Sequence, residues 1–194
     1  MQFSHDSIFD ASVLRELIER DRASARVVQQ AGCRFCGSAL DRASYVRKGR
    51  GLPPEMADIE LVRESFCCRQ EGCRRRTTPP SSLFLGRRVY LAPVVVLVSA
   101  RSVGKTHREA RSAGALFGVS PRTIGRWRRF WSREFSESAF FQVARGAFAR
   151  AIDVARLPAS LLEAFGGDLT RGTLVGALAW LATPVVPVTG VFIK

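Results

Sequence analysis

Apolar residues recur every three or four positions near both ends of the chain, and this spacing predicts a mainly helical protein. The first such segment covers residues 10–30. Asp10 is suited to cap its start and Gly32 to end it. The positions that would form its inner face are Val13, Leu14, Leu17, Ile18, Ala25 and Val28. We therefore expect an N-terminal packing helix over residues 1–31.

A second apolar segment lies in the middle of the chain, at residues 90–103. Its β-branched residues would also suit a strand. Pro93 fits the first turn of a helix, however, and further helical signals follow directly. We predict a buried helix here, since the segment is too short to span a membrane.

Two helices joined by a tight turn are predicted over residues 106–133. Thr106 and Glu109 have the spacing of a capping box. Gly118 supplies the turn, and Ser120 can cap the second helix. On that helix Ile124, Trp127 and Trp131 share one face. The pattern is typical of a helix-turn-helix domain, which we place at residues 81–134.

A helical C-terminal region is predicted over residues 135–194, with helices near 138–151, 158–165 and 170–182. No charged residue occurs from Gly172 to Ile193. Pro184 and Pro187 argue against a membrane span, so a docked apolar terminus is the preferred interpretation and membrane association is not expected.

Five cysteines interrupt this helical pattern within residues 33–73. The Cys-x2-Cys and Cys-x4-Cys spacings predict a small β zinc ribbon over residues 32–80. Its strand candidates are Ser44–Lys48, Ile59–Phe66 and Arg74–Thr78. We expect one structural zinc ion, because four thiolates leave no position open for a reacting water. The expected ligands are Cys33, Cys36, Cys68 and Cys73.

The choice between Cys67 and Cys68 stays open at this point. Neighbouring residues on a strand face opposite sides, so only one of the two can bind the metal. Cys68 gives the tighter knuckle and is preferred.

The net charge and its distribution along the chain indicate the class of binding partner. The net charge is +13 and the sequence pI about 11.0. Residues 101–133 hold nine basic residues and one acidic residue, and residues 69–88 hold six and one. Such clustering is typical of nucleic-acid binding. We expect a cytoplasmic, nucleoid-associated protein with duplex DNA as partner and no small-molecule substrate.

Each basic residue is given a role by its position. Early exposed residues of a recognition helix contact base edges, and the other arginines contact phosphates. The predicted base-reading residues are Arg122, Thr123 and Arg126. The predicted phosphate contacts are Arg74, Arg75, Arg76, Arg87, Arg88, Arg128, Arg129 and Arg133. We expect Arg74, Arg75 and Arg76, which directly follow the second cysteine knuckle, to lie near the helix-turn-helix.

Several of these motifs occur together in one family. They are Cys33-x2-Cys36-Gly37, Tyr45–Gly51, Cys68-x4-Cys73 with Arg74–Thr77, Phe84–Tyr90 and Gly118–Trp127. Over residues 32–133 the chain resembles small bacterial transposase-like proteins with a zinc ribbon and a helix-turn-helix, found near insertion sequences. The resemblance implies DNA binding linked to a mobile element, as an accessory factor or regulator, with a transposase encoded nearby as a possible partner.

Two other functions remain open from the sequence. The ribbon could bind RNA, or the chain could be a DNA-binding fragment of a transposase or recombinase. Catalysis by this chain is not expected, because Asp153, Glu163 and Asp168 show no two-metal pattern.

Overall fold

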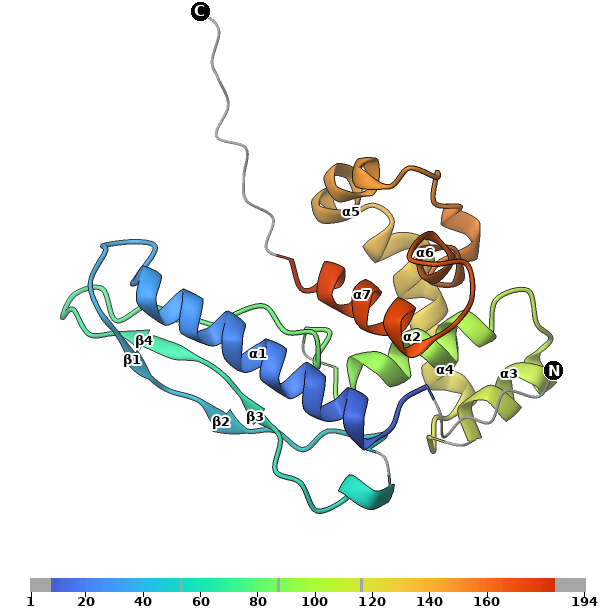
Figure 1. Ribbon diagram of the computed structural model, residues 1–194, viewed down its shortest axis with the longest axis horizontal. Coiled ribbons are helices and arrows are strands. Elements are labelled where there is room, and N and C mark those ends of the chain that lie inside the picture. The colour runs from blue at the N-terminus through green and yellow to red at the C-terminus, as the bar shows by residue number, and fades with distance from the viewer. Residues whose placement is uncertain (1–7, 53, 87, 116, 184–194) are drawn as a thin grey trace, which may run out of the picture.

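The protein has a helical part and a β part joined by one long helix, as the computed structural model shows (Figure 1). The structure describes residues 8–52, 54–86, 88–115 and 117–183. Within these residues about half of the chain is helical, with seven α-helices and two small antiparallel sheets. The mainly helical class with a small β portion is therefore confirmed at this level.

The long helix α1, Ala11–Ala31, belongs to both parts. Its apolar side chains near the start, Val13, Leu14 and Leu17, join a large core, whereas Ala25 joins a smaller cluster around the cysteines. The Asp10 carboxylate accepts hydrogen bonds from the first backbone N–H groups, as predicted. A 21-residue helix is about 31 Å long, so α1 fixes the separation between the two parts.

The β part contains five short strands. They are β1 Leu40–Arg42, β2 Tyr45–Val46, β3 Val62–Arg63, β4 Phe66–Cys68 and β5 Arg76–Thr77. One sheet has the order β1-β4-β5, and β2 pairs with β3 in the other; all pairings are antiparallel. A 3₁₀ turn at Pro54–Met56 lies between β2 and β3. The predicted strand at 59–66 is thus two strands, and β1 was not predicted.

The helical part is built around α2, Ala92–Arg101, whose side chains are buried from Ala92 to Ser99. The buried helix predicted at residues 90–103 is confirmed, with its proline in the first turn. Helix α2 packs against four others. They are α3 His107–Ala115, α4 Pro121–Arg129, α6 Ala159–Ala164 and α7 Arg171–Leu181.

The segments predicted as residues 81–134 and 135–194 share a single hydrophobic core. It includes Trp127 and Trp131 from the first segment, and Phe141, Leu161 and Leu174 from the second. After α4 the chain continues as a π-helical turn, Phe130–Phe135, and then as α5, Ala139–Ala144. Short 3₁₀ turns follow at Arg145–Ala147 and Val154–Arg156, so the helix predicted at 138–151 is shorter than expected.

None of the helices that the structure describes is long and apolar enough to cross a bilayer. The last part of the uncharged stretch, residues 184–193, lies outside the described residues, and so do its two prolines.

A buried carboxylate joins α1 to the segment that leaves the β part. Asp21 is 8% exposed, and its Oδ1 accepts hydrogen bonds from the backbone N–H of Ser82 at 2.7 Å and from the Ser82 hydroxyl at 2.9 Å. The Ser81 hydroxyl donates to the other carboxylate oxygen. Burial raises the pKa of Asp21, an effect that these hydrogen bonds oppose.

Asp21→Ala is expected to lower the free energy of unfolding by about 2–3 kcal/mol, because it leaves buried donors without an acceptor. Chemical denaturation measures this change. Glu19→Ala is the matched control on the same helix, since it breaks an exposed pair with Arg22 and should cost under about 1 kcal/mol. Equal costs for the two variants would contradict the role given to Asp21.

The pH dependence gives a second test of this residue. A carboxyl with a raised pKa binds its proton more tightly in the folded state, so its contribution to stability falls as pH rises from the ordinary value of 3.8 through the raised one. Asp21→Asn should remove this fall, and unchanged pH dependence in that variant would be the contrary result.

Candidate metal centre and nucleic-acid interface

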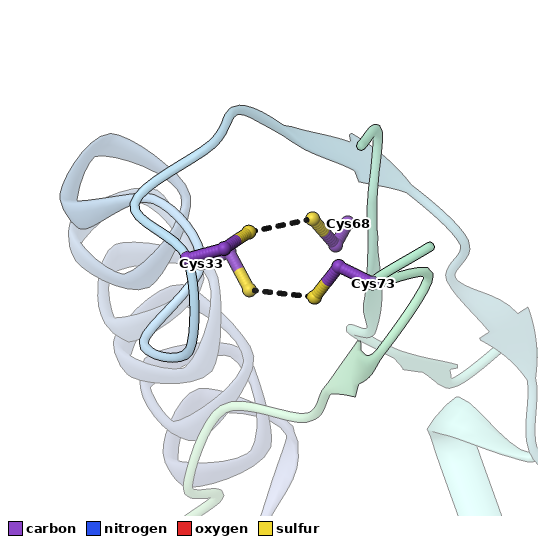
Figure 2. A group of neighbouring side chains, drawn as sticks. Cys33, Cys68 and Cys73 are labelled. Atoms are coloured by element: carbon purple, nitrogen blue, oxygen red, sulfur yellow. Dashed lines mark hydrogen bonds between the residues drawn. The ribbon is translucent and has the colours of Figure 1, made fainter. Parts of the chain in front are cut away.

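Four cysteine side chains meet at the end of α1 farthest from the helical part. The sulfur atoms of Cys33, Cys36, Cys68 and Cys73 all lie within 4.8 Å of one another. Cys33 Sγ is 3.8 Å from Cys73 Sγ, and Cys36 Sγ is 3.4 Å from Cys68 Sγ. Figure 2 shows the labelled cysteines of this group turned toward one another from two separate segments of the chain.

Tight backbone turns bring these sulfurs together. In the first knuckle the Gly37 N–H donates to the Cys33 carbonyl, and the Cys33 N–H donates to the Ser38 carbonyl. Gly37 and Gly72 both have positive φ, at 72° and 83°, which glycine adopts without strain. These two glycines thus let the backbone turn tightly beside the cysteines.

The surroundings of the Cys33 and Cys68 thiols shift their pKa values in opposite directions. Backbone N–H groups, first that of Phe35 and then that of Cys36, donate to the Cys33 sulfur and lower the pKa of this thiol to about 7. Burial raises the pKa of the Cys68 thiol to about 12. A bound cation would reverse the second effect, because it favours the thiolate directly.

The group fits a tetrahedral metal ion. Zinc–sulfur bonds of about 2.3 Å place the four sulfurs of a tetrahedron about 3.8 Å apart, close to the two pair distances of 3.8 and 3.4 Å. Cys68 is fully buried and faces the cluster, whereas the Cys67 thiol donates to the Arg74 carbonyl at 3.5 Å. The preference for Cys68 over Cys67 as a cluster member therefore agrees with the structure.

Helices α3 and α4 cross closely beside α2. The predicted capping box is present, since the Thr106 N–H donates to Glu109 and the Glu109 N–H to the Thr106 hydroxyl. Gly118 has a φ of 60° in the turn, and Ser120 caps α4. Tyr90 fixes this turn from the loop before α2: its hydroxyl donates to the Gly118 carbonyl at 3.0 Å.

The crossing needs a glycine at position 114. A Cβ atom there would lie 2.8 Å from the Val119 carbonyl oxygen and 2.8 Å from Ile124. Gly114→Ala is therefore expected to lower the free energy of unfolding by about 1–2 kcal/mol, despite alanine's higher helix propensity.

Gly125→Ala is the matched control for this prediction. A Cβ atom at Gly125 on α4 would have open space, so the variant should be as stable as the wild type or up to about 1 kcal/mol more stable. Thermal and chemical unfolding compare the two. Similar effects from both substitutions would contradict the close crossing.

An arginine stripe lies on the outer face of α4. Arg122, Arg126 and Arg129 are exposed and spaced by four and three residues, so they share one helix face. The opposite face carries Ile124 and Trp127, which are buried in the core. Arg133, in the π-helical turn, is exposed as well.

A groove of about 570 Å³ runs beside this stripe, between α4 and the loop at residues 88–90. Its lining includes three arginines, three aromatic side chains and one carboxylate: Arg88, Arg126, Arg129, Tyr90, Trp127, Phe130 and Glu134. The Arg88 guanidinium stacks on Phe130, 3.7 Å from the ring centroid. Partial burial lowers the pKa of Arg88, an effect that the nearby Glu134 carboxylate opposes.

Two predicted DNA contacts have protein partners instead. Thr123 is 9% exposed, and its hydroxyl contacts the Ser120 hydroxyl and accepts a hydrogen bond from Arg126 at 3.2 Å. Arg128 donates to the Ser102 carbonyl at 2.5 Å, which ties α4 to the end of α2. Their positions on α4 did not reveal these partners.

The other predicted phosphate contacts do not all lie beside α4. Arg74, Arg75 and Arg76 are exposed, but on the cysteine end rather than near α4; Figure 1 shows these two regions at opposite ends of the molecule. The expected proximity of the two basic patches is therefore wrong, because α1 separates them. Arg87 lies outside the described residues.

One positioning residue was missed by the sequence interpretation. Arg47 donates to the carbonyls of Gly86 and Arg88 at 2.9 and 2.7 Å, and its guanidinium lies 4.5 Å from the Phe84 ring centroid. It thereby holds the loop that forms one wall of the groove. The motif Tyr45–Gly51 contained this residue but gave no sign of its partner.

Comparison of the chain with protein-family models, with curated proteins and with solved structures gives no match.

Proposed function

We propose that this chain is a non-enzymatic, sequence-preferring duplex-DNA-binding protein whose four-cysteine group holds one structural zinc ion. The observation that carries the proposal is the stripe of exposed arginines on α4, on the face opposite its buried residues. A short helix with one face in the core and arginines on the other suits insertion into the major groove.

Each arginine of the stripe has a separate role in this proposal. Arg122 and Arg126 lie in the first two turns of α4 and contact base edges, where arginine pairs with guanine O6 and N7. Arg129 and Arg133 lie farther along and contact phosphates, which adds affinity without sequence preference. Arg88 forms the other side of the groove and is placed for a phosphate contact.

Thr123 and Arg128 take positioning roles rather than DNA contacts. Thr123 accepts a hydrogen bond from Arg126 and thereby orients its guanidinium. Arg128 holds α4 against α2. The proposed contact set is accordingly smaller than the one expected from sequence.

The zinc ion would stabilise the cysteine end and have no part in chemistry. Its four thiolate ligands would complete a tetrahedron, as in structural sites. Asp153 and Glu163 have structural partners: Asp153 caps a 3₁₀ turn and Glu163 pairs with Arg156. We assign no phosphodiester cleavage to this chain. The resemblance to transposase-like proteins favours a mobile-element accessory factor or regulator, located on the nucleoid.

Binding to duplex DNA and to structured RNA at matched salt tests the proposal. We expect tighter binding to duplex DNA, with Arg126→Ala weakening it. If RNA binds more tightly and Arg126→Ala leaves duplex binding unchanged, the RNA-binding function takes its place.

A further inference from the structure

An exposed aromatic ring lies at the tip of the first cysteine knuckle. Phe35 is 47% exposed, although it stands between two members of the cysteine group. Its backbone N–H donates to the Cys33 sulfur, so the position of the residue is tied to the knuckle. The ring is thus held in place but open to solvent.

The ring is not part of the nearby hydrophobic cluster. That cluster consists of Ala25, Cys33, Leu40, Phe66 and Cys68, with Val28 and Cys73 packed against it. Packing within the cysteine end therefore gives no reason for an aromatic residue at position 35. The exposed ring is therefore accessible to a ligand.

Two guanidinium groups stack against this ring, one from the first knuckle and one from the segment just after the second. The guanidinium carbon of Arg75 lies 4.3 Å from the ring centroid of Phe35, and that of Arg34 lies 4.7 Å from it. Arg74, directly before Arg75, has a φ of 42°, a left-handed conformation unusual for a residue with a side chain. Within the part of the chain that the structure describes, Arg34, Arg74 and Arg75 form no ion pair within 4.0 Å.

We propose that Phe35, Arg34 and Arg75 form a binding site for an unpaired DNA base. The base would extend the stack of ring and guanidinium planes, and Arg74 would contact an adjacent phosphate. Stacking on aromatic rings and arginines, combined with positive charge along the backbone, is how proteins bind single-stranded nucleic acid. The inference rests on the proposed function only in taking DNA as the ligand.

This site is separate from the arginine stripe of α4. The cysteine end and α4 lie at opposite ends of the molecule in Figure 1, with α1 between them. The protein would therefore bind duplex DNA at one end and unpaired bases at the other, as suits DNA that is partly opened.

The experiment measures affinity of the zinc-loaded full chain for a single-stranded DNA and for a blunt duplex. Phe35→Leu keeps an apolar side chain but removes the aromatic plane, and Phe35→Trp keeps the plane. Val46→Ala is the control, since Val46 is exposed on β2, outside the cysteine group. Zinc content is measured for every variant.

Phe35→Leu is expected to weaken single-stranded binding by about fivefold to 150-fold while blunt-duplex affinity and zinc content stay unchanged. Phe35→Trp should restore single-stranded binding, and Val46→Ala should change neither. In addition, an iodouracil-containing single strand should crosslink on irradiation to the peptide that contains Phe35.

Three results would overturn the inference: unchanged single-stranded binding in Phe35→Leu with zinc retained, an equal loss on both DNAs, or a Phe35-dependent preference found only for single-stranded RNA. Failure of the proposed function is distinguishable from these. It would appear as duplex binding that does not respond to Arg126→Ala, whatever the Phe35 variants do.

Discussion

Removal of the proposed zinc ion is expected to unfold the cysteine end of the protein and leave the helical part folded. The physical reason is that four thiols replace a large core there: the apolar cluster around them is small and separate from the main core. In zinc-dependent modules the metal supplies about 10–16 kcal/mol of apparent binding free energy, so its loss removes the fold. Amide hydrogen exchange with and without a chelator measures the effect along the chain.

We expect protection to be lost in residues 33–77 and in the last turns of α1, and to be kept in α2 and α7. Cys68→Ser should reproduce this result, with zinc content falling to near zero. The matched control is Cys67→Ser, one position away and outside the group, which should keep one zinc ion per chain. Protein purified without chelator that contains no zinc would contradict the metal assignment. Loss of zinc in Cys67→Ser alone would reverse the choice of ligand.

Replacing one arginine of the α4 stripe is expected to produce the second large effect. Arg126→Ala should cost about 1–3 kcal/mol on a preferred duplex and relax the preference at one base position. Arg129→Ala should weaken binding to all duplexes alike and reduce the salt slope by about one unit, because one phosphate contact is lost. Binding is measured over a range of salt on a selected duplex and on its scrambled counterpart.

The charge-matched control for both variants is Arg150→Ala, an exposed arginine in the C-terminal region. It removes the same charge and should change the slope less. Arg128→Ala should reduce protein stability, since it breaks the hydrogen bond to Ser102. Identical behaviour of Arg126→Ala and Arg129→Ala on both sequences would show that α4 does not read bases.

Local signals in the sequence predicted most helix boundaries. Asp10 caps α1, Thr106 and Glu109 form a capping box, and Ser120 caps α4, because these interactions involve residues only two or three positions apart. The strands were harder to predict. A two-residue strand such as Tyr45–Val46 is too short to show alternation, and its existence depends on the partner strand Val62–Arg63.

In the candidate site, too, features set by local spacing could be predicted and features set by tertiary contacts could not. The spacing of the cysteines was sufficient to predict the four-sulfur group, since each knuckle is a local turn. The partners of Arg47 and Arg128 could not be predicted, because they are backbone carbonyls brought near by tertiary packing. The partners of Thr123, by contrast, lie only three residues away on either side, so helical spacing alone could have indicated them. Phe35 was passed over for a related reason: burial, and not residue type, distinguishes an exposed ring from a core residue.

Photocrosslinking from α4 tests the central claim most directly. A benzoylphenylalanine placed at position 122 should crosslink to a selected duplex, because Arg122 is exposed in the first turn of the proposed recognition helix. The same group at Val143, which is 65% exposed on α5, should not. Crosslinking at position 122 and not at 143 is the result the proposal predicts. A duplex that binds but crosslinks equally from both positions, or from neither, would contradict it.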